Sequence, residues 1–181
     1  MTKVVELGFV YVDDYRSNRQ KTAASFEFSM AIESALSKGF PKVNLICDNT
    51  PDFKLDQACN VSYFQALSSG VMLKRTELQY KFLCSNRNKK IIFLDADILM
   101  RRPASQFFSS LPERWDFMLT KRNDQIHPFN GGFIGASSYS LGLNIFHLYF
   151  NTFKELEPDQ WGWWGDQSAL KLLIDKKSKY F

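Results

Sequence analysis

KKIIFLDADILMRRP, residues 89–103, is the segment with the clearest indication of a fold. Its four consecutive apolar residues, Ile91 to Leu94, predict a central strand that is covered on both faces. The strand runs directly into Asp95-Ala96-Asp97, and in extended backbone residues i and i+2 point the same way. Both carboxylates therefore converge beyond the strand, where Mg²⁺ or Mn²⁺ would relieve their repulsion. A plain pair of turn aspartates is the alternative interpretation.

Short apolar runs alternate with longer amphipathic stretches on both sides of this strand. Further strands are expected at residues 4–12, 43–47, 61–64, 117–120 and 132–135, and helices at 23–38, 73–84, 139–153 and 166–174. This alternation predicts an α/β fold with a mainly parallel, Rossmann-like central sheet and helices on both faces. Ligands of such sheets bind at the carboxyl ends of the strands, which is where Asp95 and Asp97 fall. Without repeats or Pro/Gly-rich linkers, residues 1–181 are expected to form a single domain, either complete or a fragment of a longer chain.

Composition sets limits on the partners. The net charge of +4 on 181 residues falls well short of a nucleic-acid-binding footprint. The lysines near the C-terminus are typical of a solvated helix face, with peripheral membrane contact as the alternative; they are Lys171, Lys176, Lys177 and Lys179. Three cysteines without metal-ligand spacing indicate reduced thiols. With no signal peptide or apolar span visible, the expected location is cytoplasmic.

HPFNGGFIGASS, residues 127–138, is the second informative segment. Gly131 and Gly132 precede an apolar strand and would let the backbone approach a ligand closely. Asn130 offers an amide that can hydrogen-bond a sugar hydroxyl. An ordinary Asn-Gly turn that opens a strand is the competing interpretation.

WGWWGDQSALKLLI, residues 161–174, places three tryptophans within four positions. Flat indole faces pack well against the apolar face of a pyranose. Asp166 and Gln167 follow, where Asp166 would suit a helix N-cap. The alternative is that the tryptophans only plug the core. Ahead of the Asp95 strand, Lys81 would either reach a donor phosphate or form a helical ion pair with Glu77.

The order of these segments resembles the GT-A glycosyltransferases. A helix carrying Lys81, then FLDADIL, FNGGFIG and WGDQSAL, is most similar to family eight, which includes glycogenin and bacterial lipopolysaccharide galactosyltransferases. The resemblance covers residues 73–173, and loosely the first strand. It implies a metal-dependent transfer of a sugar from a nucleotide diphosphate, with UDP-sugars favoured as donors and a glycan or glycoprotein as acceptor.

The resemblance also implies roles for particular residues. Asp95 and Asp97 would bind Mn²⁺ or Mg²⁺, and Lys81 would contact the donor. Asn130, Asp166 and Gln167 would act at the reacting centre. The remaining donor-binding positions would be Val10, Tyr11, Val12, Asp13, Gly131, Gly132 and Trp164, besides Asp95 itself.

Two departures from the family pattern leave the mechanism open. The C-terminal histidine that supplies a third metal ligand in family eight has no counterpart after Trp164. WGWWGD also resembles the WGWGGE segment of the inverting β-1,4-galactosyltransferases. Retention is slightly favoured; inversion would need a base, for which Asp166 and then Asp124 are the candidates. A nucleotide-sugar-forming nucleotidyltransferase and a non-catalytic sugar-binding module are the competing functions.

Overall fold

The computed structural model describes residues 5–13 and 18–177 and confirms the α/β prediction. The strands are β1 (Val5–Tyr11), β2 (Val43–Cys47), β3 (Cys59–Tyr63), β4 (Lys90–Leu94), β5 (Phe117–Lys121) and β6 (Phe129–Ser137). The helices are α1 (Asn18–Ser37), α2 (Val71–Ser85), α3 (Ala104–Ser109), α4 (Ser140–Lys154) and α5 (Gly165–Lys177), with a 3₁₀ turn, η1 (Pro158–Trp161). The short elements α3 and η1 were not expected from the sequence.

All six strands form one sheet in the order β3-β2-β1-β4-β6-β5. β1 pairs in parallel with both β2 and β4, and β2 pairs in parallel with β3. β6 runs antiparallel to β4 and to β5. The sheet is therefore mainly parallel, as predicted, with an antiparallel end where β5 and β6 follow each other closely in the chain.

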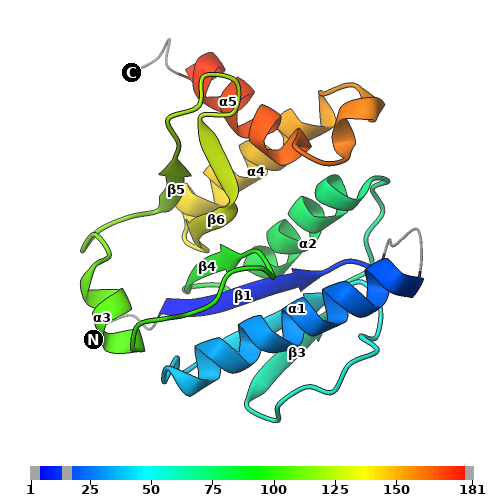
Figure 1. Ribbon diagram of the computed structural model, residues 1–181. Helices are drawn as coiled ribbons and strands as arrows, with labels where there is room; N and C mark the ends of the chain where they lie inside the picture. The colour runs from blue at the N-terminus through cyan, green and yellow to red at the C-terminus, as the bar shows by residue number, and fades with distance from the viewer. Residues whose placement is uncertain (1–4, 14–17, 178–181) are drawn as a thin grey trace.

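Helices cover both faces of the sheet (Figure 1). Along β1, Leu7 and Phe9 belong to the apolar cluster beneath α1, whereas Val10 belongs to the cluster shared with α2, α4 and α5. The last four residues of β4, residues 91–94, are all buried, because this central strand contributes to both clusters. The carboxyl end of β4 is therefore packed between two apolar clusters.

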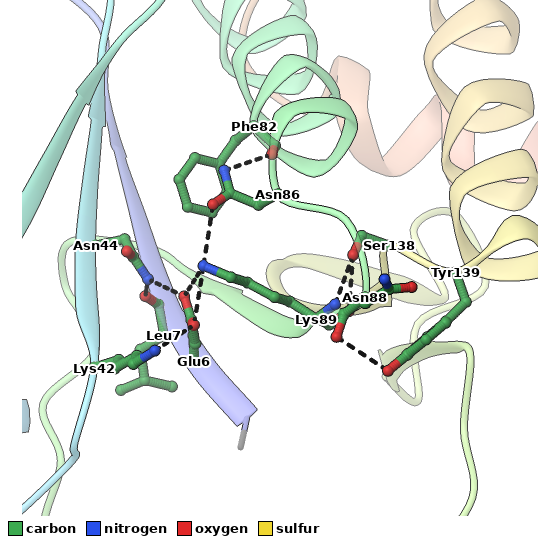
Figure 2. A network of polar contacts seen from close by, with 10 residues as sticks. All are labelled: Glu6, Leu7, Lys42, Asn44, Phe82, Asn86, Asn88, Lys89, Ser138 and Tyr139. Carbon is green, nitrogen blue, oxygen red and sulfur yellow. Dashed lines mark hydrogen bonds and ion pairs between the residues drawn. The ribbon is translucent and has the colours of Figure 1, made fainter. Parts of the chain in front are cut away.

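A polar network ties the sheet together at the edge where β1 and β4 begin (Figure 2). Glu6 is 2% exposed, and its carboxylate lies 3.2 Å from the ammonium of Lys89 and 3.5 Å from that of Lys42. The amide of Asn44 donates to the same carboxylate at 3.2 Å. Ser138 joins in because it receives the backbone N–H of Lys89 at 2.8 Å. The network thus links β1, β2, β4 and the end of β6.

Cys47 and Cys59 are buried, and Cys84 is partly buried. Burial raises the pKa of Cys47 to about 12 and that of Cys59 to about 11. Within the part of the chain that the structure describes, no helix is both long and apolar enough to cross a membrane. In the lysine run, Lys176 forms an ion pair with Glu155, and Lys179 lies outside the described residues.

Candidate functional site

A cavity of about 480 Å³ lies at the carboxyl ends of β1 and β4. Its walls come from these strand ends, the start of α2, part of α1 and the loop that precedes α5 (orange in Figure 1). Eight of the predicted site residues line it: Val10, Val12, Asp95, Asp97, Asn130, Trp164, Asp166 and Gln167. The three motifs recognised separately in the sequence therefore meet at one place.

Asp95 holds its place because the sheet continues one step beyond β4. Its backbone N–H donates to the carbonyl of Gly132 at 3.0 Å, and its own carbonyl accepts the N–H of Ile98 at 3.1 Å. The chain therefore turns directly after the strand and presents both aspartates to the cavity. The side chain of Asp95 is 35% exposed, and Asp97 is exposed.

Arg75 is the central residue that the sequence interpretation missed. Its guanidinium contacts the Asp95 carboxylate at 2.6 Å and donates to the carbonyl of Gly131 at 2.5 Å, and its side chain is only 13% exposed. Burial disfavours the charged guanidinium, but the Asp95 and Asp166 carboxylates outweigh burial and raise the pKa of Arg75. The cavity wall therefore carries a permanent positive charge.

Asp166, in the first turn of α5, interacts electrostatically with the same cation. It is 2% exposed, and its carboxylate accepts the N–H of Gln167 at 2.9 Å. Burial raises the pKa of Asp166, while the nearby Arg75 opposes that rise. The neighbouring Gln167 receives a hydrogen bond from Arg122 at 3.3 Å, so both residues of the Asp-Gln pair are held in fixed positions.

Gly131 and Gly132 have a structural task that differs from the predicted one. A Cβ at Gly131 would overlap the Asp166 carboxylate, and one at Gly132 would overlap that of Asp95. Neither glycine lines the cavity. Because these glycines have no side chain, the carboxylates of Asp166 and Asp95 can pack directly against the backbone. Asn130 accepts the N–H of Gly132 at 3.0 Å and fixes this turn of the backbone.

Three further predicted donor-binding positions lie elsewhere. Lys81 does not line the cavity, because its ammonium contacts Glu77 at 2.6 Å and donates to the carbonyl of Gln65. It lies six residues after Arg75, which is about 9 Å farther along α2. The predicted helical ion pair is the alternative that the structure bears out.

Tyr11 and Asp13 are also absent from the cavity lining. The side chain of Tyr11 is buried on the α1 side, with its ring 5.3 Å from that of Phe28. Alternation along the strand explains this, since Val10 and Val12 share the opposite face. Asp13 donates its backbone N–H to Asp48 at 3.0 Å.

Asp124, the second candidate base, is likewise outside the cavity. Its carboxylate accepts the backbone N–H groups of His127 and Ile126, at 3.0 and 2.8 Å. These two hydrogen bonds lower its pKa, which makes it a weaker base. Its contacts are those of a turn residue.

Asp95 and Asp97 are the candidate ligands for a divalent cation in this cavity. Over residues 5–13 and 18–177, no group of three or more His, Cys, Asp or Glu side chains is arranged to hold a metal ion. Asp95 and Asp97 nevertheless suit Mg²⁺ or Mn²⁺, because such cations commonly bind one or two carboxylates and complete their shell with phosphate oxygens and water. One carboxylate oxygen of Asp95 already forms an ion pair with Arg75.

Solved glycosyltransferase structures share this fold. The apo form of GlyE from Streptococcus pneumoniae TIGR4 matches with a TM-score of 0.61 at 16% identity, covering 97% of this chain and 44% of that one. A second GlyE structure matches with a TM-score of 0.56 at 15% identity, covering 96% of this chain and 43% of that one. The apo structure of the bifunctional enzyme WbbM matches with a TM-score of 0.61 at 10% identity, covering 96% and 38%.

These likenesses define the class of fold: this is the GT-A-like fold seen in glycosyltransferases. At such low identity they establish the fold alone. The chain spans less than half the length of the structures that it matches. No protein-family model and no curated protein sequence matches it, so the likeness to family eight stays a prediction.

Proposed function

We propose that this chain binds a nucleotide-diphosphate sugar, with UDP-sugars favoured, and transfers the sugar to a hydroxyl of a glycan or glycoprotein acceptor. One observation carries the proposal: Asp95, Asp97, Arg75, Asp166 and Gln167 surround a single cavity at the carboxyl edge of the sheet. This is the edge where open α/β sheets bind ligands. Since the solved relatives are longer, the whole activity is proposed for this domain together with whatever completes it.

The cavity lining holds two guanidinium groups, those of Arg75 and Arg122, that suit a diphosphate, and a divalent cation would offset its carboxylates. Arg75 stays charged, and Val71 and Met72 from the first turn of α2 line the cavity beside it. A helix start adds partial positive charge from its free N–H groups. Arg75 takes over the donor contact that was predicted for Lys81. Because Asp95 and the Gly131 carbonyl fix its guanidinium, little reorganisation is needed when phosphate oxygens arrive.

Asp95 and Asp97 would hold the divalent cation, which when bound would neutralise charge growing on the departing diphosphate. In the transfer itself, the acceptor oxygen bonds to the anomeric carbon while the bond from that carbon to the diphosphate oxygen breaks. The hydroxyl proton leaves with the diphosphate or with solvent. Asn130 and Gln167 would orient the sugar from the cavity wall.

The surroundings of Asp166 favour retention over inversion. An inverting enzyme needs a carboxylate that reaches the acceptor hydroxyl, whereas Asp166 is 2% exposed and faces Gly131 and Arg75. We therefore assign Asp166 to positioning Arg75 and not to deprotonating the acceptor. NMR of the anomeric proton of the product distinguishes the two outcomes, and an inverted product would contradict this assignment.

Calorimetry with UDP tests the donor site directly. Wild-type protein should bind UDP more tightly with Mn²⁺ than without, and Asp97→Ala should weaken the metal-dependent affinity at least tenfold. Asp159→Ala is the matched control, because Asp159 is an exposed aspartate of η1 that does not line the cavity. A sugar-binding module would show no metal-dependent UDP binding. If Asp97→Ala binds as the wild type does, the metal role is wrong.

A further inference from the structure

The three tryptophans before α5 lie in two different environments. Trp161 packs against the core, and its indole N–H donates to the carbonyl of Leu156 at 2.9 Å. Trp163 and Trp164 are 74% and 47% exposed, although both line the cavity. Burying an indole is strongly favourable, so two exposed indoles next to one anchored indole require an explanation other than core packing.

The backbone that carries these rings is fixed. A Cβ at Gly70 would come within 2.9 Å of the Trp161 carbonyl, and one at Gly165 would overlap the carbonyl of Gln160. The carbonyl of Trp164 accepts two N–H groups at the start of α5, both at 3.1 Å. Trp164 itself has φ of 73°, a left-handed conformation that is costly for a bulky side chain. The two rings are therefore presented from a preorganised loop.

Polar groups line the same cavity as the exposed rings. Arg122 and Gln167 line the cavity and hydrogen-bond each other at 3.3 Å. The ring of His127 stacks on Trp164 at 5.4 Å with an interplanar angle of 23°, which covers one indole face. Flat apolar faces beside amide and guanidinium donors match a pyranose, whose C–H face is apolar and whose rim carries hydroxyls.

We propose that Trp163 and Trp164 form the acceptor subsite, and that the acceptor is a pyranose unit of a glycan. This rests on the proposed function, since the donor is assigned to the inner wall. Arg75 and Asp166 there are buried, whereas the tryptophans lie on the exposed side of the same cavity. A donor held by the inner residues leaves the indole side for the acceptor. Trp163, the more exposed of the two, makes the principal stacking contact.

Saturation-transfer NMR tests the subsite without any donor. The probes are methyl β-D-galactopyranoside, methyl β-D-glucopyranoside and methyl α-D-mannopyranoside. Wild-type protein should saturate the ring C–H protons of at least one glycoside. Trp163→Ala should weaken its binding about tenfold, as expected for a lost stacking contact, and Trp163→Phe should keep part of it.

Phe26→Ala is the matched control, since Phe26 is 67% exposed on α1 but does not line the cavity. It should leave glycoside binding unchanged, and Trp163→Ala should leave UDP affinity unchanged. The proposal is overturned if no glycoside is saturated, if Trp163→Ala binds within twofold of wild type, or if it loses UDP affinity instead. Absence of UDP binding by the wild type would refute the proposed function separately, because the glycoside measurement uses no nucleotide.

Discussion

Replacing Arg75 by methionine removes the cation that separates two carboxylates and tests whether this charge arrangement holds the site together. The substitution keeps much of the side-chain volume but leaves Asp95 and the buried Asp166 facing each other. Removing one partner of a buried ion pair costs about 3–5 kcal/mol. Since water reaches Asp95, which is 35% exposed, we expect the lower end, about 3 kcal/mol at pH 7.

The loss should depend on pH in a defined direction. The pKa of Asp166 is raised in the fold, so its ionisation destabilises the protein increasingly as pH rises through that pKa. Without Arg75 the pKa rises further, because the opposing cation is gone. The difference in unfolding free energy between Arg75→Met and wild type should therefore be largest near pH 7 and should shrink toward pH 4.

Urea unfolding followed by tryptophan fluorescence measures this difference at several pH values. Arg75→Met/Asp166→Asn should recover part of the stability at pH 7, because asparagine cannot ionise. Arg114→Met, at an exposed arginine, is the control and should change stability by less than about 0.5 kcal/mol. An equal loss at pH 4 and pH 7, together with no recovery in the double variant, would refute the reasoning.

Three further perturbations probe other parts of the molecule. Gly131→Ala should cost about 1–3 kcal/mol in urea unfolding, since its Cβ overlaps a carboxylate, whereas Gly162→Ala enters open space and should be nearly neutral; equal effects would contradict this. Lys81→Ala should leave UDP affinity within about twofold. Burial opposes ionisation of Glu77, yet hydrogen bonds from Lys81 and residues 67–68 lower its pKa to about 2. The ionised Glu77 carboxylate therefore stabilises the fold above about pH 4.5, and this stabilisation is lost as pH falls toward 2. Between pH 4.5 and 2, the melting temperature of Lys81→Ala should therefore vary less with pH than that of the wild type. The same pH profile for both proteins would contradict this prediction. Glu6→Ala should lower the unfolding free energy by about 2–4 kcal/mol without changing UDP affinity, and a weakened affinity would show that the two edges are coupled.

The sequence predicted the layers of the fold because burial leaves a direct pattern. The apolar residues of β4, residues 91–94, indicated a strand covered on both faces, and they are buried as expected. The antiparallel placement of β6 leaves no comparable pattern, since it depends on which neighbour pairs with the strand. The short elements α3 and η1 fall below the length at which helical periodicity is visible.

The site was predicted in part for the same reason. Asp95, Asp97, Asp166 and Gln167 stand at strand and helix ends, which topology brings to one edge. Arg75 was missed in favour of Lys81, although helix direction held the signal. A helix that leads back into a parallel strand begins at the carboxyl edge of the sheet, so its first turns, and not its last, face the ligand.

The Glu6 network and the cavity lie at opposite ends of the strands, and β6 runs between them with Asn130 near one end and Ser137 at the other. Because of this separation, NMR signals from the network should not move when a ligand binds in the cavity. There the amide of Lys89 donates to the Ser138 hydroxyl, and the amide of Ser138 donates to the Lys89 carbonyl. Both amide signals should keep their NMR positions while signals at Asn130 move with added nucleotide. A titration can thus be read against signals just beyond the far ends of β4 and β6, without an external standard.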